Sequence, residues 1–347
     1  MANIQTVTGR ISGSDMGVTL PHEHVFIDQR SIWSRPLSKE KEPLVDMKVS
    51  IENLGYLSRD MDLCKDNLVL DDADMLAREL LMFKALGGKT IVDVTTRGLS
   101  PNPMALREMS RRVGLNIVAG CGYYVGLAHP PDMSAKTVDR LAEEMIKDIQ
   151  VGFEGTDVKA GIIGEIGTSH PLADNEKKVL RAAARAQKST GVAITVHNPW
   201  RGKHGLQIVD ILESEGVDPS RIIMGHMDDM DEWRENMTFE FHSKIAERGV
   251  WIQFDDFGEE NYCDAANFVH PRDIERVIAL RRLISVGYLD SLLISQDVCM
   301  KTYTRAYGGY GYDHIQRTIV PMMNQLGISK AEVERIMVDN PRRAIAH

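Results

Sequence analysis

The segment VTLPHEHVFI (residues 18–27) decides between two α/β folds for this chain. Its apolar residues are typical of a buried strand, and it carries two histidines, His22 and His24, near its end. A doubly wound sheet that binds a nucleotide needs a glycine-rich turn after its first strand. The residues at this point, PHEHVFID (21–28), are not such a turn. The segment therefore favours the other common arrangement, a closed barrel.

Seven further segments resemble this first strand. They are rich in isoleucine and valine and almost continuously apolar, as parallel strands buried on both faces should be. These strands are predicted at 90–96, 116–124, 160–167, 193–198, 222–228, 250–257 and 292–298. Amphipathic helices are predicted near 73–86, 103–113, 135–150, 174–190, 205–215, 239–248, 271–286 and 313–326. Eight repeats of strand and helix predict a (β/α)8, or TIM, barrel that forms a single domain over residues 1–347.

Three segments lie outside this repeat. Glycines punctuate the residues before the first strand, which predicts a short N-terminal hairpin. Residues 28–71 form a long insertion after the first strand, and we expect them to lie over the mouth of the barrel. The last segment reads as a terminal helix that Ser329 caps and that ends at Asn340–Pro341.

The composition narrows the classes of protein to consider. Of 347 residues, 43% are hydrophobic and 26% charged, as in an ordinary globular protein. The net charge of -9 and the lack of a basic run make nucleic acid or an anionic membrane surface an unexpected partner. The sequence shows no secretory signal and no apolar run long enough for a transmembrane helix. Four scattered cysteines form no framework, so we expect a reduced, cytoplasmic protein.

Histidine and carboxylate side chains stand at the ends of five predicted strands, where a barrel enzyme builds its active site. They are His22 and His24 on the first strand, Glu165 on the fourth, His197 on the fifth, His226 on the sixth and Asp297 on the eighth. Alternate strand residues point to the same side, so both histidines of the first strand face inward and Glu23 faces away. Four imidazoles and two carboxylates exceed the three protein ligands of one catalytic zinc. They suit two metal ions about 3.5–4 Å apart.

Each of these residues also has a structural alternative. A single histidine at a strand end more often makes a hydrogen bond than binds a metal, and Asp297 could cap the next helix. Glu165 is harder to explain in this way, because a carboxylate within an apolar strand must be paired or bind a cation. We interpret the six as one site because all are predicted at the same end of the barrel. Of the remaining histidines, His129 and His170 follow strands and are weaker pocket candidates.

Seven motifs, in this order, resemble the phosphotriesterase family of the amidohydrolase superfamily. They are GVTLPHEHV, GIIGEIGTS, ITVHN, GHMDD, QFDDFG, SQDV and YGGYGYDHI, within about residues 5–343. The set is most similar to the phosphotriesterase-related, or phosphotriesterase homology, branch. The resemblance implies the same barrel and a binuclear divalent centre, usually of zinc, with manganese or cobalt as alternatives. It also implies a homodimer as a family-level expectation.

The resemblance further implies an assignment of ligands. His22, His24 and Asp297 match the ligands of the buried metal, and His197 and His226 match those of the exposed metal. Many members bridge the metals with a carboxylated lysine on the fourth strand, but GIIGEIG contains no lysine. The related branch places a glutamate there, so we assign the bridge to Glu165. A slip of one residue in this strand would turn its side chain away.

The implied mechanism is hydrolysis by a hydroxide that bridges the metals, with Asp297 as the catalytic residue that takes and returns the proton. We expect the bond to be a carboxylic ester, lactone or amide of a small molecule that carries a negative charge. The alternatives are a phosphotriester hydrolase and a non-catalytic metal- or ligand-binding barrel. Residues in the loops after the strands are candidates for binding the substrate, or are solvated loop residues. They are Tyr123, Tyr124, Trp200, Arg201, Lys301 and Arg305.

Overall fold

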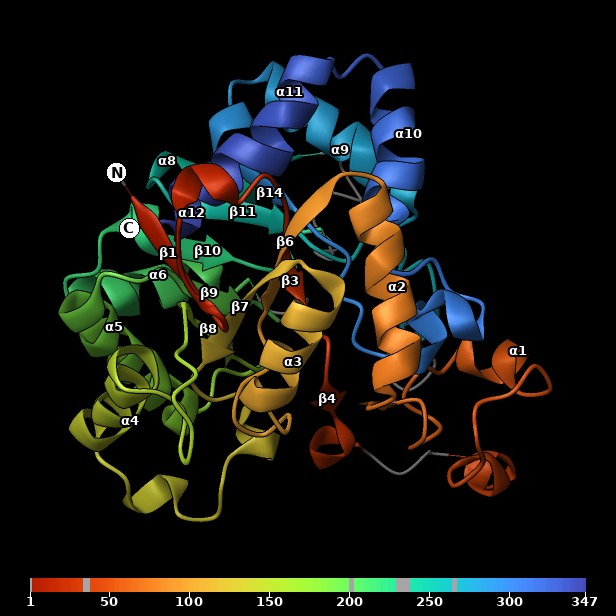
Figure 1. Ribbon diagram of the computed structural model, residues 1–347, viewed down its shortest axis with the longest axis horizontal. Coiled ribbons are helices and arrows are strands. Elements are labelled where there is room, and N and C mark those ends of the chain that lie inside the picture. Colours follow the sequence, from red (N-terminus) through yellow and green to blue (C-terminus); the bar gives the residue numbers. More distant parts are fainter. Residues whose placement is uncertain (1, 34–37, 200–202, 229–237, 264–266) are drawn as a thin grey trace.

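Eight parallel strands form one sheet in the computed structural model, which describes residues 2–33, 38–199, 203–228, 238–263 and 267–347 (Figure 1). The strands are β3 (Val18–Glu23), β6 (Gly88–Asp93), β7 (Asn116–Cys121), β8 (Ile162–Gly167), β9 (Ile194–His197), β10 (Ile222–Met224), β11 (Trp251–Phe254) and β14 (Leu292–Ile294). Each strand pairs with the next one along the chain. The predicted (β/α)8 barrel of a single domain is thereby confirmed.

Helices connect these strands and cover the outside of the sheet. They are α2 (Ala73–Ala85), α3 (Pro103–Val113), α4 (Val138–Gln150), α5 (Asp174–Thr190), α6 (Gly205–Ser214), α8 (Glu240–Glu247), α9 (Asp273–Ser285) and α10 (Val320–Gln325). The sequence explains their ends. For α3, the Asn102 side chain accepts a hydrogen bond from the Ala105 N–H, and Gly114 ends the helix in the left-handed conformation. These are common start and stop signals of a helix.

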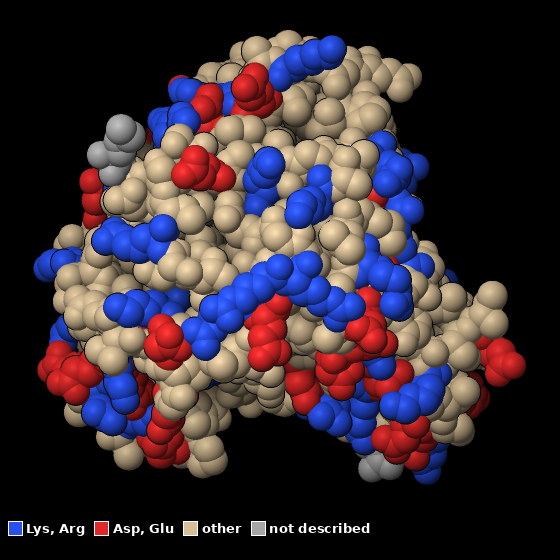
Figure 2. Space-filling view, viewed as in Figure 1, with Lys and Arg blue, Asp and Glu red and all other residues tan. Residues whose placement is uncertain are grey.

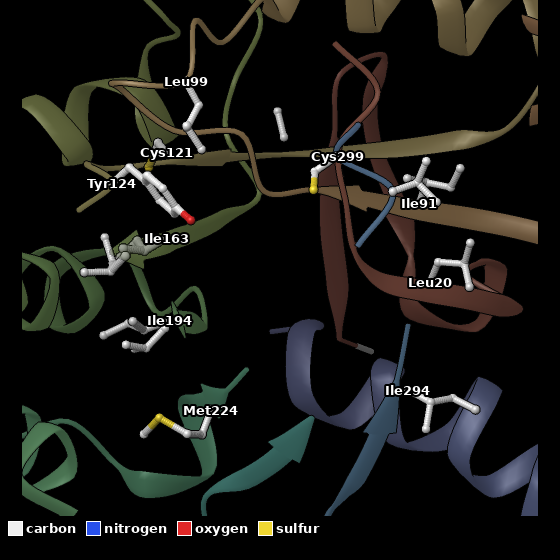
Figure 3. Close-up of a cluster of buried hydrophobic side chains, with 14 of the residues drawn as sticks. Leu20, Ile91, Leu99, Cys121, Tyr124, Ile163, Ile194, Met224, Ile294 and Cys299 are labelled. Carbon is white, nitrogen blue, oxygen red and sulfur yellow. The ribbon is translucent and has the colours of Figure 1, made fainter. Parts of the chain in front are cut away.

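The strand pleat divides the apolar side chains into two cores. Ile91, Ile117 and Ile222 belong to the large core beneath the helices, whereas their chain neighbours belong to a second core. Figure 3 shows members of the large core from six strands, namely Leu20, Ile91, Ile163, Ile194, Met224 and Ile294. Because successive strand residues point to opposite faces, the second core fills the inside of the barrel. Its members on or next to the eight strands are Val92, Val118, Ile162, Ala193, Ile223, Trp251 and Leu293.

The N-terminal hairpin and the last residues of the chain close the bottom of this inner core. β1 (Asn3–Thr6) and β2 (Gly9–Ser12) are antiparallel, which confirms the predicted hairpin. Asn3 and His347 exchange two backbone hydrogen bonds of 2.9 Å. Ile4 and Ile345 belong to the inner core, and the two termini lie close together in Figure 1. The strand ends that carry the candidate site are therefore left open at the opposite end.

The insertion after the first strand folds against the loop that follows β14. Its ends are joined by β4 (Ile27–Asp28) and β5 (Val69–Leu70), and it contains the short helix α1 (Leu54–Leu57). Leu57 and Leu63 belong to a small core of the insertion, against which Tyr307 of the later loop packs. Met61 lines a cavity together with His197 and Asp297. The insertion thus reaches the mouth of the barrel, as expected.

Several boundaries differ from the sequence prediction. The terminal helix begins after Ser329, but it does not end at Asn340–Pro341, because α12 (Asn340–Ile345) continues the helical path. A π-helical turn at Arg335–Asp339 lies directly before α12. Pro341 is therefore in the first turn of α12, where its missing N–H costs little. The strands predicted at 222–228, 250–257 and 292–298 also end early, at Met224, Phe254 and Ile294.

None of the helices that the structure describes combines the length and apolar character needed to cross a bilayer. On the face shown in Figure 2, lysine and arginine side chains are interspersed with aspartate and glutamate. This face therefore carries charges of both signs, although the net charge of the chain is -9.

Candidate metal centre

The six predicted ligands converge at the carboxyl ends of the strands. Glu165 Oε1 lies 2.7 Å from His197 Nδ1, 3.1 Å from His226 Nε2 and 3.7 Å from His22 Nε2. On the other side of His22, Asp297 Oδ1 lies 3.8 Å from His22 Nε2 and 3.1 Å from His24 Nε2. The two carboxylates therefore flank His22, each with further imidazoles around it. The structure brings together residues that are up to 275 positions apart in the chain.

Glu165 points into this cluster because of an irregularity in β8. The pairing of β8 with β9 shifts between Ile163 and Ile166, so the strand does not follow a regular pleat here. Gly164 has φ of +114°, and a Cβ atom at this position would lie 2.2 Å from the carbonyl oxygen of Thr195. Only glycine fits so close to the neighbouring strand. The register that the sequence left open thus turns the Glu165 carboxylate toward the imidazoles.

His226 and Asp297 reach the cluster from beyond their strands. Both lie after the last paired residue of β10 and β14, and both have positive φ, of 51° and 48°. Such a conformation is uncommon for residues with a side chain and is found preferentially at functional sites. His22 lies within β3 and His24 directly after it, and both approach Asp297 Oδ1, whereas the alternation of strand residues does not apply to His226 and Asp297.

Three of the histidines are held by side chains outside the predicted set. His22 Nδ1 donates to Asp255 Oδ2 at 2.8 Å, and His24 Nδ1 lies 2.8 Å from Thr95 Oγ1. His226 Nδ1 lies 3.1 Å from Asp256 Oδ1. A partner on the second ring nitrogen fixes the direction in which the first nitrogen points, as is usual for histidines that bind a metal. The sequence shows the two adjacent aspartates in the motif FDDFG. It does not show which histidine each of them contacts.

Glu23, the residue between the two histidines of the first strand, joins β3 to β14. It is fully buried, and its Oε1 accepts hydrogen bonds from Ser295 Oγ (2.7 Å) and the Gln296 N–H (3.0 Å). Its Oε2 accepts from the Val298 N–H at 2.9 Å. Glu23 thus accepts hydrogen bonds from Gln296 and Val298, the residues on both sides of Asp297. Its predicted direction, away from the metal ligands, is the one observed.

The electrostatics of the cluster fit divalent cations. Burial alone would lower the pKa of the His22 imidazole, but Asp255, Asp297 and Glu165 around it raise that pKa to about 10. Burial opposes the charged form of Glu165, yet His197 and His22 bring its pKa well below the usual range. The Nε2 atom of the buried His22 has no hydrogen-bond partner among the described residues. A site that attracts positive charge so strongly, with a free ring nitrogen between two carboxylates, has the donors that zinc and similar ions prefer.

A small cavity opens above these residues. It has a volume of about 180 Å³ and is lined by His197, His226 and Asp297 on its floor. Its walls combine apolar or aromatic residues, among them Met61, Phe268 and Met300, with acidic ones such as Asp62 and Glu259. Tyr124 also borders the centre, with its hydroxyl 3.4 Å from His197 Nδ1. The cavity is large enough for a small molecule next to the predicted metal ligands.

Most of the other predicted substrate-binding residues are engaged elsewhere. Tyr123 directs its hydroxyl to Glu144, in a separate pocket lined by Arg97 and Lys136. Lys301 pairs with Asp66 at 2.9 Å, because the insertion packs against its loop. The structure therefore does not bring Tyr123 or Lys301 to the centre.

Arg305 is likewise committed to a carboxylate, and its Nε lies 2.9 Å from Asp313 Oδ1. Trp200 and Arg201 lie outside the described residues. The weaker candidate His170 contacts His204 instead, with 2.8 Å between His170 Nδ1 and His204 Nε2. Of the four predicted substrate-binding residues that the structure describes, Tyr124 lies beside the cluster and the other three have the partners given above.

Comparison with known proteins gives matches over almost the whole chain. The model of the phosphotriesterase family matches residues 2–345. An N-acetyltaurine hydrolase from Xenopus tropicalis is 36% identical, over 98% of this chain and 97% of that protein. The solved structure of a resiniferatoxin-binding protein from Rhodobacter sphaeroides is 36% identical with a TM-score of 0.95, over 99% of this chain and 94% of that one. A lactonase from Listeria monocytogenes is 26% identical with a TM-score of 0.76, over 99% of both chains.

These matches agree with the geometry of the site. The barrel, the cluster of imidazoles and carboxylates, and relatives named for hydrolysis are found together along one chain. The chain therefore belongs to the phosphotriesterase family, and it is a metal-dependent hydrolase.

Proposed function

We propose that this protein hydrolyses an amide or lactone bond of a small molecule at a centre of two metal ions. His22, His24 and Asp297 would hold one ion, His197 and His226 the other, and Glu165 would bridge them. The observation that carries the proposal is the position of Glu165 Oε1, within 3.7 Å of imidazole nitrogens of His22, His197 and His226, which lie on or just after three different strands. Nitrogen and carboxylate donors favour zinc, with manganese or cobalt as alternatives.

The residues of this chain supply the rest of the chemistry. When bound, the two cations activate water as a nucleophile and polarise the bond that is attacked. Asp297 lies on the floor of the cavity, so its carboxylate can take the proton of the attacking water and return it to the leaving group. Tyr124 places its hydroxyl beside His197, where it can orient the substrate. The apolar wall residues Phe268 and Met300 offer a surface against which an apolar part of the substrate can pack.

The relatives guide the choice of bond. A relative 36% identical is named for hydrolysis of the amide N-acetyltaurine, and a structural neighbour 26% identical is named a lactonase. We therefore place an N-acyl amide first and a lactone second, with a carboxylic ester in the same class. Phosphotriesters serve as the comparison. None of the four cysteines forms a disulfide and all four are buried, which supports a reducing, cytoplasmic location.

Rates on a small panel test this proposal. Protein loaded with zinc or manganese is assayed on N-acetyltaurine, other N-acyl amino acids, a lactone, an aryl ester and a phosphotriester. We expect two metals per chain and kcat/KM for an amide or lactone at least tenfold above that for the phosphotriester, a difference of about 1.4 kcal/mol in transition-state binding. Faster hydrolysis of the phosphotriester contradicts the choice of bond. Less than one metal per chain without hydrolysis favours a binding protein instead.

A further inference from the structure

A buried ion pair lies behind the candidate metal centre, between Arg276 on α9 and Asp228. Both side chains are completely buried, and Arg276 Nε donates to Asp228 Oδ2 at 2.8 Å. Arg276 Nη1 also donates to the carbonyl oxygens of Glu259 (2.9 Å) and Pro271 (2.7 Å). These acceptors lie in different directions, which the planar fork of arginine can serve and the single ammonium of lysine cannot.

Asp228 in turn holds the backbone that follows β11. Its Oδ1 accepts the Asp255 N–H at 3.1 Å, and its Oδ2 accepts the Asp256 N–H at 3.0 Å. The charge of Arg276 stabilises the buried Asp228 carboxylate in this position. The pair therefore fixes the direction in which two further carboxylates leave the chain.

Both of those carboxylates contact predicted metal ligands. Asp255 Oδ2 lies 2.8 Å from His22 Nδ1, and Asp255 Oδ1 accepts the His226 N–H at 2.7 Å. Asp256 Oδ1 lies 3.1 Å from His226 Nδ1. A continuous set of hydrogen bonds thus runs from α9 to two histidines of the centre. These are His22, on β3, and His226, just after β10.

We propose that Arg276 is a positioning residue for the metal centre. Acting through Asp228 and Asp255, it sets the orientation of the His22 and His226 imidazoles. The inference rests on the proposed metal centre. Its physical basis is that partners behind metal ligands restrict ring orientation, and their loss typically costs about 10–100-fold in metal affinity or activity.

The test compares three variants of the full chain. Arg276→Lys keeps the charge but loses the fork, and Asp228→Asn keeps the shape but loses the charge. Arg97→Lys is the matched control, because Arg97 Nη1 pairs with the buried carboxylate of Asp148 at 2.6 Å, away from the cluster. Two quantities are measured: zinc affinity by competition with a chelator, and hydrogen exchange of the Asp255, Asp256 and His226 amides in metal-free protein.

We expect zinc affinity to fall about 10–100-fold in Arg276→Lys and Asp228→Asn, and by less than about threefold in Arg97→Lys. The three amides should exchange faster in the first two variants than in the control. Unchanged affinity in both variants, or an equal loss in Arg97→Lys, overturns the inference. If the wild-type protein binds no zinc, the proposed function is wrong. The exchange rates of the three amides then test the positioning role of Arg276 independently. Faster exchange then supports the positioning role of Arg276, and equal exchange rejects it.

Discussion

At the scale of single residues, environment gives similar carboxylates different roles. Asp255 is completely buried and already accepts hydrogen bonds from His22, His226 and Gln253. Asp297 lies at the edge of the cavity, with 13% of its side chain exposed, and contacts His24. A carboxylate without free acceptor positions serves to orient its neighbours, whereas one that faces the cavity can meet a substrate. This contrast supports Asp297, and not Asp255, as the group that transfers the proton.

The role of Asp297 predicts a specific effect of Asp297→Asn. The amide keeps the shape and one oxygen of the carboxylate but cannot accept a proton. We expect turnover to fall by about 10²–10⁴-fold, while metal content falls far less, because proton transfer by a positioned side chain contributes about that much. Steady-state kinetics and metal analysis of the same preparation check this. Near-normal turnover would show that another group moves the proton.

At the scale of elements, Asp66 is one of the residues that attach the insertion to the loop after β14, beside Asn67, which accepts the N–H groups of Lys301 and Thr302. Asp66 accepts hydrogen bonds from the Lys48 ammonium (2.6 Å) and the Val49 N–H (3.0 Å), and it pairs with Lys301 (2.9 Å). Burial raises the pKa of this carboxyl, but Lys48, Val49 and Lys301 outweigh it and bring the pKa to about 2. Because this insertion also lines the cavity through Met61, its attachment bears on the shape of the site.

The low pKa of Asp66 predicts a pH-dependent contribution to stability. The folded pKa lies below the ordinary 3.8, so the contribution is complete above about pH 4 and is lost as the pH falls toward 2. We expect Asp66→Asn to lower the free energy of unfolding by about 1–2 kcal/mol at pH 7, after allowance for solvent screening. The difference from wild type should shrink as the pH falls from about 4 to about 2, measured by denaturant unfolding.

A neighbouring ion pair provides the control for Asp66→Asn. Asp46 pairs with Lys65 at 2.9 Å in the same insertion, but 81% of its side chain is exposed. Asp46→Asn should therefore change stability by at most about 0.5 kcal/mol at any pH in this range. An equal effect of the two substitutions would contradict the special role of Asp66.

At the scale of the whole molecule, side chains rather than a strand ladder join the first and last strands of the barrel. Ser295 Oγ accepts the His22 N–H at 3.2 Å and donates to Glu23, and Glu23 holds Gln296 and Val298. The predicted ligands of the buried metal come from both sides of this junction, His22 from β3, His24 from just after it and Asp297 from beyond β14. A bound ion would therefore link the two edges of the sheet.

Removal of metal should then weaken this junction more than the rest of the barrel. Ligands that bind only the folded state add about 2.7 kcal/mol at a concentration 100 times their Kd. We expect treatment with a chelator to lower Tm and to raise hydrogen exchange of the Gln296 and Val298 amides more than that of the β8–β9 pairs. Adding zinc should restore both. Loss of metal that leaves both Tm and exchange unchanged would contradict the link.

The sequence by itself determined the order of strands and helices, the barrel, and the types of residues at the candidate centre. Periodicity of apolar residues reports which side of an element is buried, and histidines or carboxylates at strand ends report a common location. This information is contained in short segments of the chain, so it can be read from the sequence alone.

Only the tertiary structure decided which polar groups support the centre. The contacts of Asp255 with His22, of Glu23 with the β14 side and of Arg276 with Asp228 join residues from separate elements. The positive φ values of His226 and Asp297 also follow from the loops that hold them. The ion pairs of Lys301 and Arg305 likewise divert two residues that the sequence suggested for the substrate. The physical reason is that a side chain's direction beyond a strand end depends on neighbours distant in sequence, and no local pattern records them.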